Sequence, residues 1–115
     1  MAKTRMIHEF GMGTSLRRRD YTEAAARAIR DALWHNSVNI AEAFGFEKSD
    51  MIIDVEIGAQ DPSAVDTSKL LDIFPYGQPS ITVKHGGLDI PQPDGSGVTV
   101  VVNAAVMVSF DMEAA

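Results

Sequence analysis

Three consecutive arginines follow two closely spaced glycines near the start of the chain. Gly11 and Gly13 come after an apolar stretch, and Arg17–Arg19 stand a few residues later, directly before Asp20. Guanidinium groups bind carboxylates and phosphates through paired hydrogen bonds. Glycines permit a sharp turn and let backbone N–H groups approach a ligand closely. The pattern therefore predicts a site for a small anionic molecule at a turn between a strand and a helix.

The nucleotide-binding motifs that this pattern resembles are incomplete. The dinucleotide fingerprint needs a third glycine where Leu16 stands, and no Gly-Lys-Ser/Thr sequence is present. A tight structural turn explains the glycine pair as well, and solvation or ion pairs with a neighbouring chain explain the arginines. Asp20 also places a negative charge at the predicted helix start, which weighs against a strong anion site. The residues expected to contact the ligand are Gly11, Gly13, Ser15, Arg17, Arg18, Asn36 and Asn103.

Two residues are candidates for proton transfer. Glu9 stands two residues before the glycine pair, near the end of a predicted strand, where α/β proteins often place functional groups. As a general base it would suit a hydrolase or an isomerase acting on a small acid. A salt bridge or simple exposure explains Glu9 equally well. His35 ends the predicted main helix, where the helix dipole stabilises a histidine without any catalytic role.

The sequence predicts neither a metal site nor a cofactor. His8, His35 and His85 have no metal-binding spacing, and there is no cysteine to supply a thiolate or a disulfide. Because His8 shares a strand side with Met6 and Phe10, we expect it to be a hydrogen-bonded core histidine.

Length and composition indicate one globular domain, residues 1–115. The chain is 45% hydrophobic and 23% charged, as in ordinary folded domains. Its net charge of -6 disfavours general nucleic-acid binding. The apolar stretch from Val98 is interrupted at Thr99 and Asn103, and the longest uninterrupted run, Ala104–Val108, is far shorter than the ~20 residues of a membrane span. With no signal peptide and no cysteine, we expect a cytoplasmic protein.

Hydrophobic periodicity and turn residues predict the elements that position these residues. A two-layer α+β fold in the order β-α-β-α-β-β is expected, with a roughly four-stranded mixed or antiparallel sheet and helices on one face. The predicted strands are 4–10, Met51–Ile57, 80–90 with a bend at Gly86-Gly87, and Val98–Phe110. The predicted helices are Tyr21–His35, capped by Asp20, a short one through Ala43, and another from Asp66 to Phe74.

The last predicted strand has one apolar side and one mixed side. Its even positions from Val98 to Phe110 are all apolar, whereas its odd positions include Thr99, Asn103 and Ser109. A half-apolar second side is typical of a surface that meets another subunit or lines a cavity. We therefore expect a homo-oligomer. Asn103, if buried, must be hydrogen-bonded, and it would fix strand register, a subunit contact or a ligand.

Several stretches taken together resemble the Lin0512 family, a group of small conserved proteins of unknown function. The resemblance covers almost the whole chain in the right order, and the stretches that carry it are Glu9–Gly13, Asp20 before an alanine-rich run, Ala32–Ser37, Phe74–Gly77, Gly86–Leu88 and Val102–Val106. The family attaches no activity to this chain.

The chain departs from the family's Gly-x-Gly-x-Asp-x-His-Gly signature. Gly11 and Gly13 match it, but Ser15 stands at the Asp position, Arg17 at the His position and Arg18 at the last Gly position. An arginine in place of a histidine keeps a hydrogen-bond donor and fixes a positive charge. The exchange favours anion binding over a proton-transfer or metal role.

Two hypotheses follow from the sequence. In the first, the protein binds a small anionic molecule in a pocket between subunits, formed by Glu9, the Gly11–Arg19 stretch and His35-Asn36. In the second, the protein is a non-catalytic structural or regulatory homo-oligomer, and its arginine cluster pairs with acidic faces of neighbouring subunits.

Overall fold

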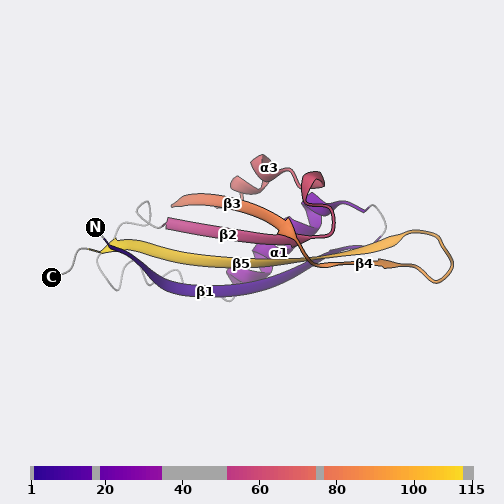
Figure 1. Ribbon diagram of the computed structural model, residues 1–115, viewed down its shortest axis with the longest axis horizontal. Coiled ribbons are helices and arrows are strands. Elements are labelled where there is room, and N and C mark those ends of the chain that lie inside the picture. The colour runs from indigo at the N-terminus through magenta and orange to yellow at the C-terminus, as the bar shows by residue number, and fades with distance from the viewer. Residues whose placement is uncertain (1, 17–18, 35–51, 75–76, 113–115) are drawn as a thin grey trace.

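The computed structural model describes residues 2–16, 19–34, 52–74 and 77–112. These residues form a five-stranded mixed sheet with helices over one face (Figure 1), which confirms the expected α+β class. In chain order the elements are β1 (Ala2–Ser15), α1 (Tyr21–Trp34), β2 (Ile52–Ala59), the 3-10 helix η2 (Pro62–Ala64), α3 (Thr67–Leu71), β3 (Gln78–His85), β4 (Leu88–Pro91) and β5 (Val98–Met112). The short helix expected through Ala43 lies outside the described residues.

Strand β5 is the centre of the sheet. It pairs antiparallel with β1 along almost its whole length, from Ala2↔Met112 to Ser15↔Val100. On its other side β5 pairs antiparallel first with β2 and then, beyond the end of β2, with β4. Strand β3 pairs parallel with β2 and forms the edge opposite β1. The long strand that the apolar alternation predicted is thus the strand on which the sheet is built.

The sheet has five strands because the predicted strand 80–90 divides into two. Before the bend its residues pair with β2, and after the bend they pair with β5. The chain crosses between these partners at Gly86 and Gly87, whose carbonyl oxygens both accept hydrogen bonds from Gln60 Nε2. Gly87 has a φ of 63°, and a Cβ there would lie 2.2 Å from the carbonyl oxygen of Val101. Only glycine fits this crossing.

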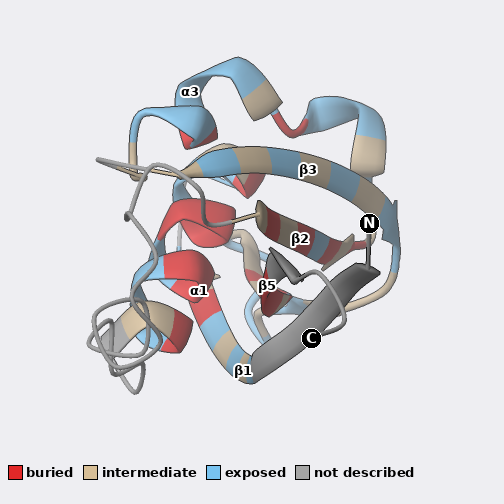
Figure 2. Cartoon of the chain, turned by 90° about the vertical axis from the view of Figure 1, so that its left-hand side faces the viewer, coloured by how far each residue is buried: buried red, intermediate tan, exposed pale blue. Residues whose placement is uncertain are grey.

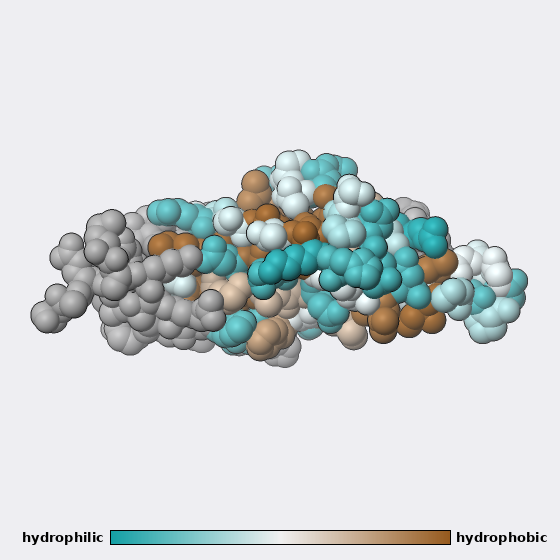
Figure 3. Space-filling model, in the orientation of Figure 1, coloured by the Kyte–Doolittle hydropathy of each residue, from teal (hydrophilic) through white to brown (hydrophobic). Residues whose placement is uncertain are grey.

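Helix α1 covers one face of the sheet and forms the core with it (Figure 2). The even positions of β5 point toward the helix, as predicted, and Val100, Val102 and Val106 are completely buried. In α1 the matching positions are mostly alanines and Ile29. We call the opposite face, which looks toward the viewer in Figures 1 and 3, the open face, because no described helix lies over it. None of the described helices is long and apolar enough to span a membrane.

Gly11 and Gly13 do not form the predicted turn. They continue β1 and pair with Ala104 and Val102 of β5. Helix α1 crosses directly over them: a Cβ on Gly11 would lie 2.1 Å from the carbonyl oxygen of Ala28, and one on Gly13 would lie 2.1 Å from that of Ala24. The two glycines therefore permit close helix–strand packing, and the prediction of a turn at this pair is wrong.

The predicted helix caps are present. The Asp20 carboxylate accepts a hydrogen bond from the Glu23 N–H at 3.0 Å, and the Asp66 carboxylate accepts one from the Ser68 N–H at 3.1 Å. Both signals are local, because a cap needs only one side chain and the next turn of backbone. Helix α3 nevertheless ends at Leu71, before the predicted end at Phe74.

Substituting Gly13 by Ala tests the close packing of α1 on β1. The new Cβ would meet helix backbone, which cannot move aside as a side chain can, so we expect a loss of at least about 2–3 kcal/mol in the free energy of unfolding. Gly58→Ala is the matched control, because a Cβ there would meet its nearest atom at an ordinary 3.4 Å. Urea unfolding of both variants measures the difference, and equal losses would contradict this account.

Candidate functional site

The structure places some of the predicted site residues and leaves others outside the described part of the chain. Those outside it are Arg17, Arg18, His35 and Asn36. Those it describes are Glu9, Gly11, Gly13, Ser15 and Asn103. The described ones do not converge on one pocket. Gly11 and Gly13 lie under α1, and Asn103 points to the other face of the sheet.

Glu9 lies apart from the Ser15 end of β1. Both residues are on the α1 side of the strand, where Glu9 pairs with Val106 and Ser15 pairs with Val100. Six residues of extended strand separate them by roughly 20 Å, and α1 packs over Gly11 and Gly13 between them. Within one chain, Glu9 therefore does not join a pocket at the end of β1. Its role as a general base stays a prediction.

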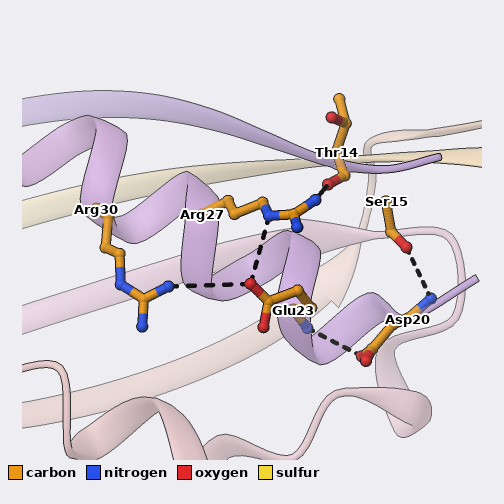
Figure 4. Close-up of polar contacts among 6 residues, drawn as sticks. All are labelled: Thr14, Ser15, Asp20, Glu23, Arg27 and Arg30. Carbon is orange, nitrogen blue, oxygen red and sulfur yellow. Dashed lines mark hydrogen bonds and ion pairs between the residues drawn. The ribbon is translucent and has the colours of Figure 1, made fainter. Parts of the chain in front are cut away.

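Ser15 helps to hold the start of α1. It is 5% exposed, and its Oγ accepts a hydrogen bond from the Asp20 N–H at 3.2 Å (Figure 4). The Asp20 carboxylate already occupies the first turn of the helix. Arg19, between them, is exposed and has a φ of 51°, in the left-handed region that non-glycine residues rarely adopt. This strained residue turns the chain from β1 into α1.

Arginines on α1 are bound to their own chain. Arg27 Nη1 donates to the Thr14 carbonyl oxygen at 2.6 Å, and Arg27 and Arg30 both approach Glu23 Oε1 (Figure 4). One turn further along, Asp31 Oδ2 accepts the Met12 N–H at 3.0 Å. Because β1 is an edge strand, these side chains satisfy backbone groups that would otherwise be free to pair with another strand.

A buried hydrogen bond joins the start of α1 to β4. Tyr21 is 6% exposed, and its hydroxyl donates to Asp89 Oδ2 at 2.5 Å. Burial first, and then this hydrogen bond, raise the pKa of Tyr21 to about 12. The second carboxylate oxygen, Asp89 Oδ1, is buried and has no partner among the described residues. The pair holds β4, which otherwise rests mainly on β5.

A cavity of about 640 Å³ lies beside the loop between β4 and β5. The described residues that line it are Leu16, Gln92, Asp94, Ser96 and Gly97. Hydrogen bonds from Ser96 lower the pKa of Asp94, so this carboxylate is charged at neutral pH. The volume suits a small molecule, and the lining favours one that offers hydrogen-bond donors.

The open face carries an apolar stripe that follows β1, β5 and β4. It consists of Phe10 (63% exposed), Met12 (55%), Leu88 (58%) and Ile90 (47%). Pairing with odd positions of β5, which point away from α1, puts these side chains on the same face. Figure 3 shows hydrophobic surface on this face toward the end where β4 lies, beside a hydrophilic band. Large exposed apolar patches mark interaction surfaces.

On this face the prediction of a buried His8 is wrong, and the condition set for Asn103, that it be buried, is not met. His8 is exposed and lies against Phe10, with 4.5 Å between ring centroids, so it is not a core histidine. Asn103 is also exposed, between Met12 of β1 and Gly58 of β2.

Sequence reasoning missed the apolar stripe and the Tyr21–Asp89 bond. The alternation of residues along the strands could have revealed the stripe. If the predicted strand 4–10 is extended through the glycines, Met12 falls on the same side as Phe10. Leu88 and Ile90 likewise share one side of their strand, with Asp89 on the other. Nothing local indicates the second, since 68 residues separate its partners. Among the residues that the structure describes, no group of three or more His, Asp or Glu side chains is arranged to hold a metal ion.

Replacing Tyr21 by Phe tests the buried bond. The variant leaves a buried carboxylate without its hydrogen-bond donor, so we expect the free energy of unfolding at pH 7 to fall by about 1–3 kcal/mol. Because the folded pKa of Tyr21 lies above its unfolded value near 10, its contribution to stability is complete below pH 10 and is lost as the pH rises toward about 12. Urea unfolding from pH 7 to 12 should therefore show a steeper fall for the parent than for the variant. Parallel profiles would contradict the bond.

Comparison with known proteins identifies relatives but no activity. No curated protein matches the chain. Among solved structures, the crystal structure of an FtsZ-like protein of unknown function from Nostoc punctiforme is 31% identical, with a TM-score of 0.86 over 97% of this chain and 99% of that one. The family model described as "Conserved hypothetical protein (Lin0512_fam)" matches residues 5–108. The chain therefore belongs to the Lin0512 family, as the resemblance indicated.

Proposed function

We propose that this protein is a self-associating structural protein whose copies pack the open faces of their sheets together. The observation that carries the proposal is the apolar stripe of Phe10, Met12, Leu88 and Ile90 on the face opposite α1. A two-layer fold buries one side of its sheet, so an apolar second side needs another cover.

The exposed apolar area of the stripe is large enough to contribute substantially to a dimer interface. The four stripe side chains expose roughly 400 Å² per copy, at about 200 Å² for a large side chain. Two copies together would bury roughly 800 Å² from the stripes, and neighbouring positions of β5 bring the contact toward the ~1,200 Å² at which specific interfaces begin. At about 25 cal/mol per Å² this burial favours association.

The low charge of the stripe permits a second copy as the occupant. The chain carries a net charge of -6, so its copies repel one another unless the surface between them is low in charge. The stripe has no ionisable side chain. On the same face, at the β2–β3 side, Lys84 Nζ and Glu56 Oε1 are 2.6 Å apart and neutralise each other. This arrangement gives an apolar contact with a polar rim.

The edge of β1 also favours face-to-face packing. Arg27 and Asp31 of α1 occupy the outward backbone groups of Thr14 and Met12. A second copy cannot extend the sheet at these positions without breaking both contacts. Association through the open face leaves both of these hydrogen bonds intact.

Lysine substitution in the stripe tests the proposal. We expect the parent to be dimeric or larger at micromolar concentration, and Leu88→Lys to weaken association by at least about 10-fold, because a buried ammonium has no partner there. Leu71→Lys is the matched control: it makes the same change at another exposed leucine, which is 40% exposed and lies on α3. Analytical ultracentrifugation over a concentration series measures both. A monomeric parent, or equal behaviour of the two variants, would overturn the proposal.

The cavity beside the β4–β5 loop supports a second candidate function, binding of a small polar molecule. Asp94 and Gln92 offer a charged acceptor and an amide in a space of about 640 Å³. This lining suits an amine better than the anion that the arginine cluster suggested from sequence.

Thermal shift with ethylamine, acetate and phosphate separates the two ligand classes. We expect stabilisation by ethylamine that Asp94→Asn abolishes, because the amide lacks the charge. Stabilisation by acetate or phosphate alone would instead support the anion hypothesis, and no shift with any of them would contradict both.

A further inference from the structure

We infer that Asn103 fixes the register of the face-to-face dimer by pairing with the partner's Asn103. The inference rests on the proposed self-association and names the residue that makes the contact specific. It assigns to Asn103 neither a ligand nor a role in strand pairing within the chain.

Asn103 occupies an interior position of the apolar surface. It pairs with Met12 on one side and with Gly58 on the other. Two residues away along β5, on the same face, lie Val101 and Ala105, which pair with Leu88 and Phe10 respectively. A second sheet that covers the stripe must therefore cover Asn103 as well.

The Asn103 side chain is exposed and has no partner in the part of the chain that the structure describes. Among the described residues its amide makes no hydrogen bond, and its neighbours are a thioether and a residue without a side chain. A buried amide requires hydrogen bonds to both its oxygen and its nitrogen. Burial against an apolar partner would leave both unsatisfied, so the partner must supply a polar group at this point.

A second copy supplies that group by symmetry. In a two-fold interface the same patch meets itself, and a residue at the axis faces its own counterpart. A carboxamide carries both a donor and an acceptor, so two asparagines can each donate to the oxygen of the other. The neighbouring position, Gly58, has no side chain to obstruct this approach.

One polar pair in an apolar contact has a further consequence. Two apolar faces can shift relative to each other at little cost, because many relative positions bury similar apolar areas. An asparagine pair that is displaced in this way loses its hydrogen bonds. A single buried Asn is known to specify register in this way at helical interfaces. We therefore expect Asn103 to affect the relative position of the two subunits more than the dissociation constant of the dimer.

Distance measurements on spin-labelled dimers test the inference. The chain has no cysteine, so Thr82→Cys, at an exposed position of β3 on the open face, gives one labelling site per copy. Electron–electron resonance should give one narrow distance distribution with Asn103 present. With Asn103→Val we expect dimers that persist but show a broadened or multiple distribution. A single narrow distribution with Asn103→Val would overturn the inference.

A charge substitution gives an independent measurement. Asn103→Asp places two carboxylates together at the axis, so we expect at least about 100-fold weaker dimerisation at pH 7, with recovery as the pH falls toward 4. Thr82→Asp is the control for added charge at the rim. If Asn103→Asp dimerises as tightly as the control, Asn103 does not lie at the two-fold axis and the inference is wrong, whereas the proposed self-association is unaffected. If the parent itself is monomeric, the proposed function fails first.

Discussion

The close contact between α1 and β1 is the interaction on which the rest of the structure depends. Gly11 and Gly13 let the helix backbone approach the strand to a distance that any Cβ would prevent. This approach brings Arg27 and Asp31 within hydrogen-bond reach of the strand's outer edge. It therefore buries one face of the sheet and at the same time occupies the outward Met12 N–H and Thr14 carbonyl of one edge. On the open face Met107 and Ser109 of β5 are buried, whereas Phe10, Met12, Leu88 and Ile90 remain exposed.

Sequence reasoning predicted the features whose causes are local. The alternation of β5 and the caps at Asp20 and Asp66 depend on a few neighbouring residues, and the structure confirms them. The Gly11–Gly13 pair was misinterpreted because glycine serves two purposes, positive φ and close approach. Which one applies depends on where α1 returns across the sheet. The division between β3 and β4 was missed for a similar reason, since it depends on which strand lies beside each segment.

The prediction about burial failed where it required knowledge of which face is covered. Alternation correctly grouped His8 with Phe10, but it does not say whether a group faces a helix or water. Both residues proved to be exposed, as did Asn103. Glu9 and Ser15 both lie on the α1 side of β1, and the extended strand keeps them apart. The expected pocket assumed a turn at Gly11 and Gly13, which β1 does not make.

The two faces of the sheet are coupled through β4. Successive residues of a strand point to opposite faces, so when Asp89 is held against Tyr21 on the helix side, Leu88 and Ile90 must project from the open face. The pairing of β4 with β5 and this buried hydrogen bond thus together orient half of the apolar stripe. The other half, Phe10 and Met12, is oriented by β1, which α1 holds in place through Gly11 and Gly13. The first turn of α1 therefore influences side chains on the open face that it does not contact. A substitution at Tyr21 would affect Leu88 and Ile90 through β4.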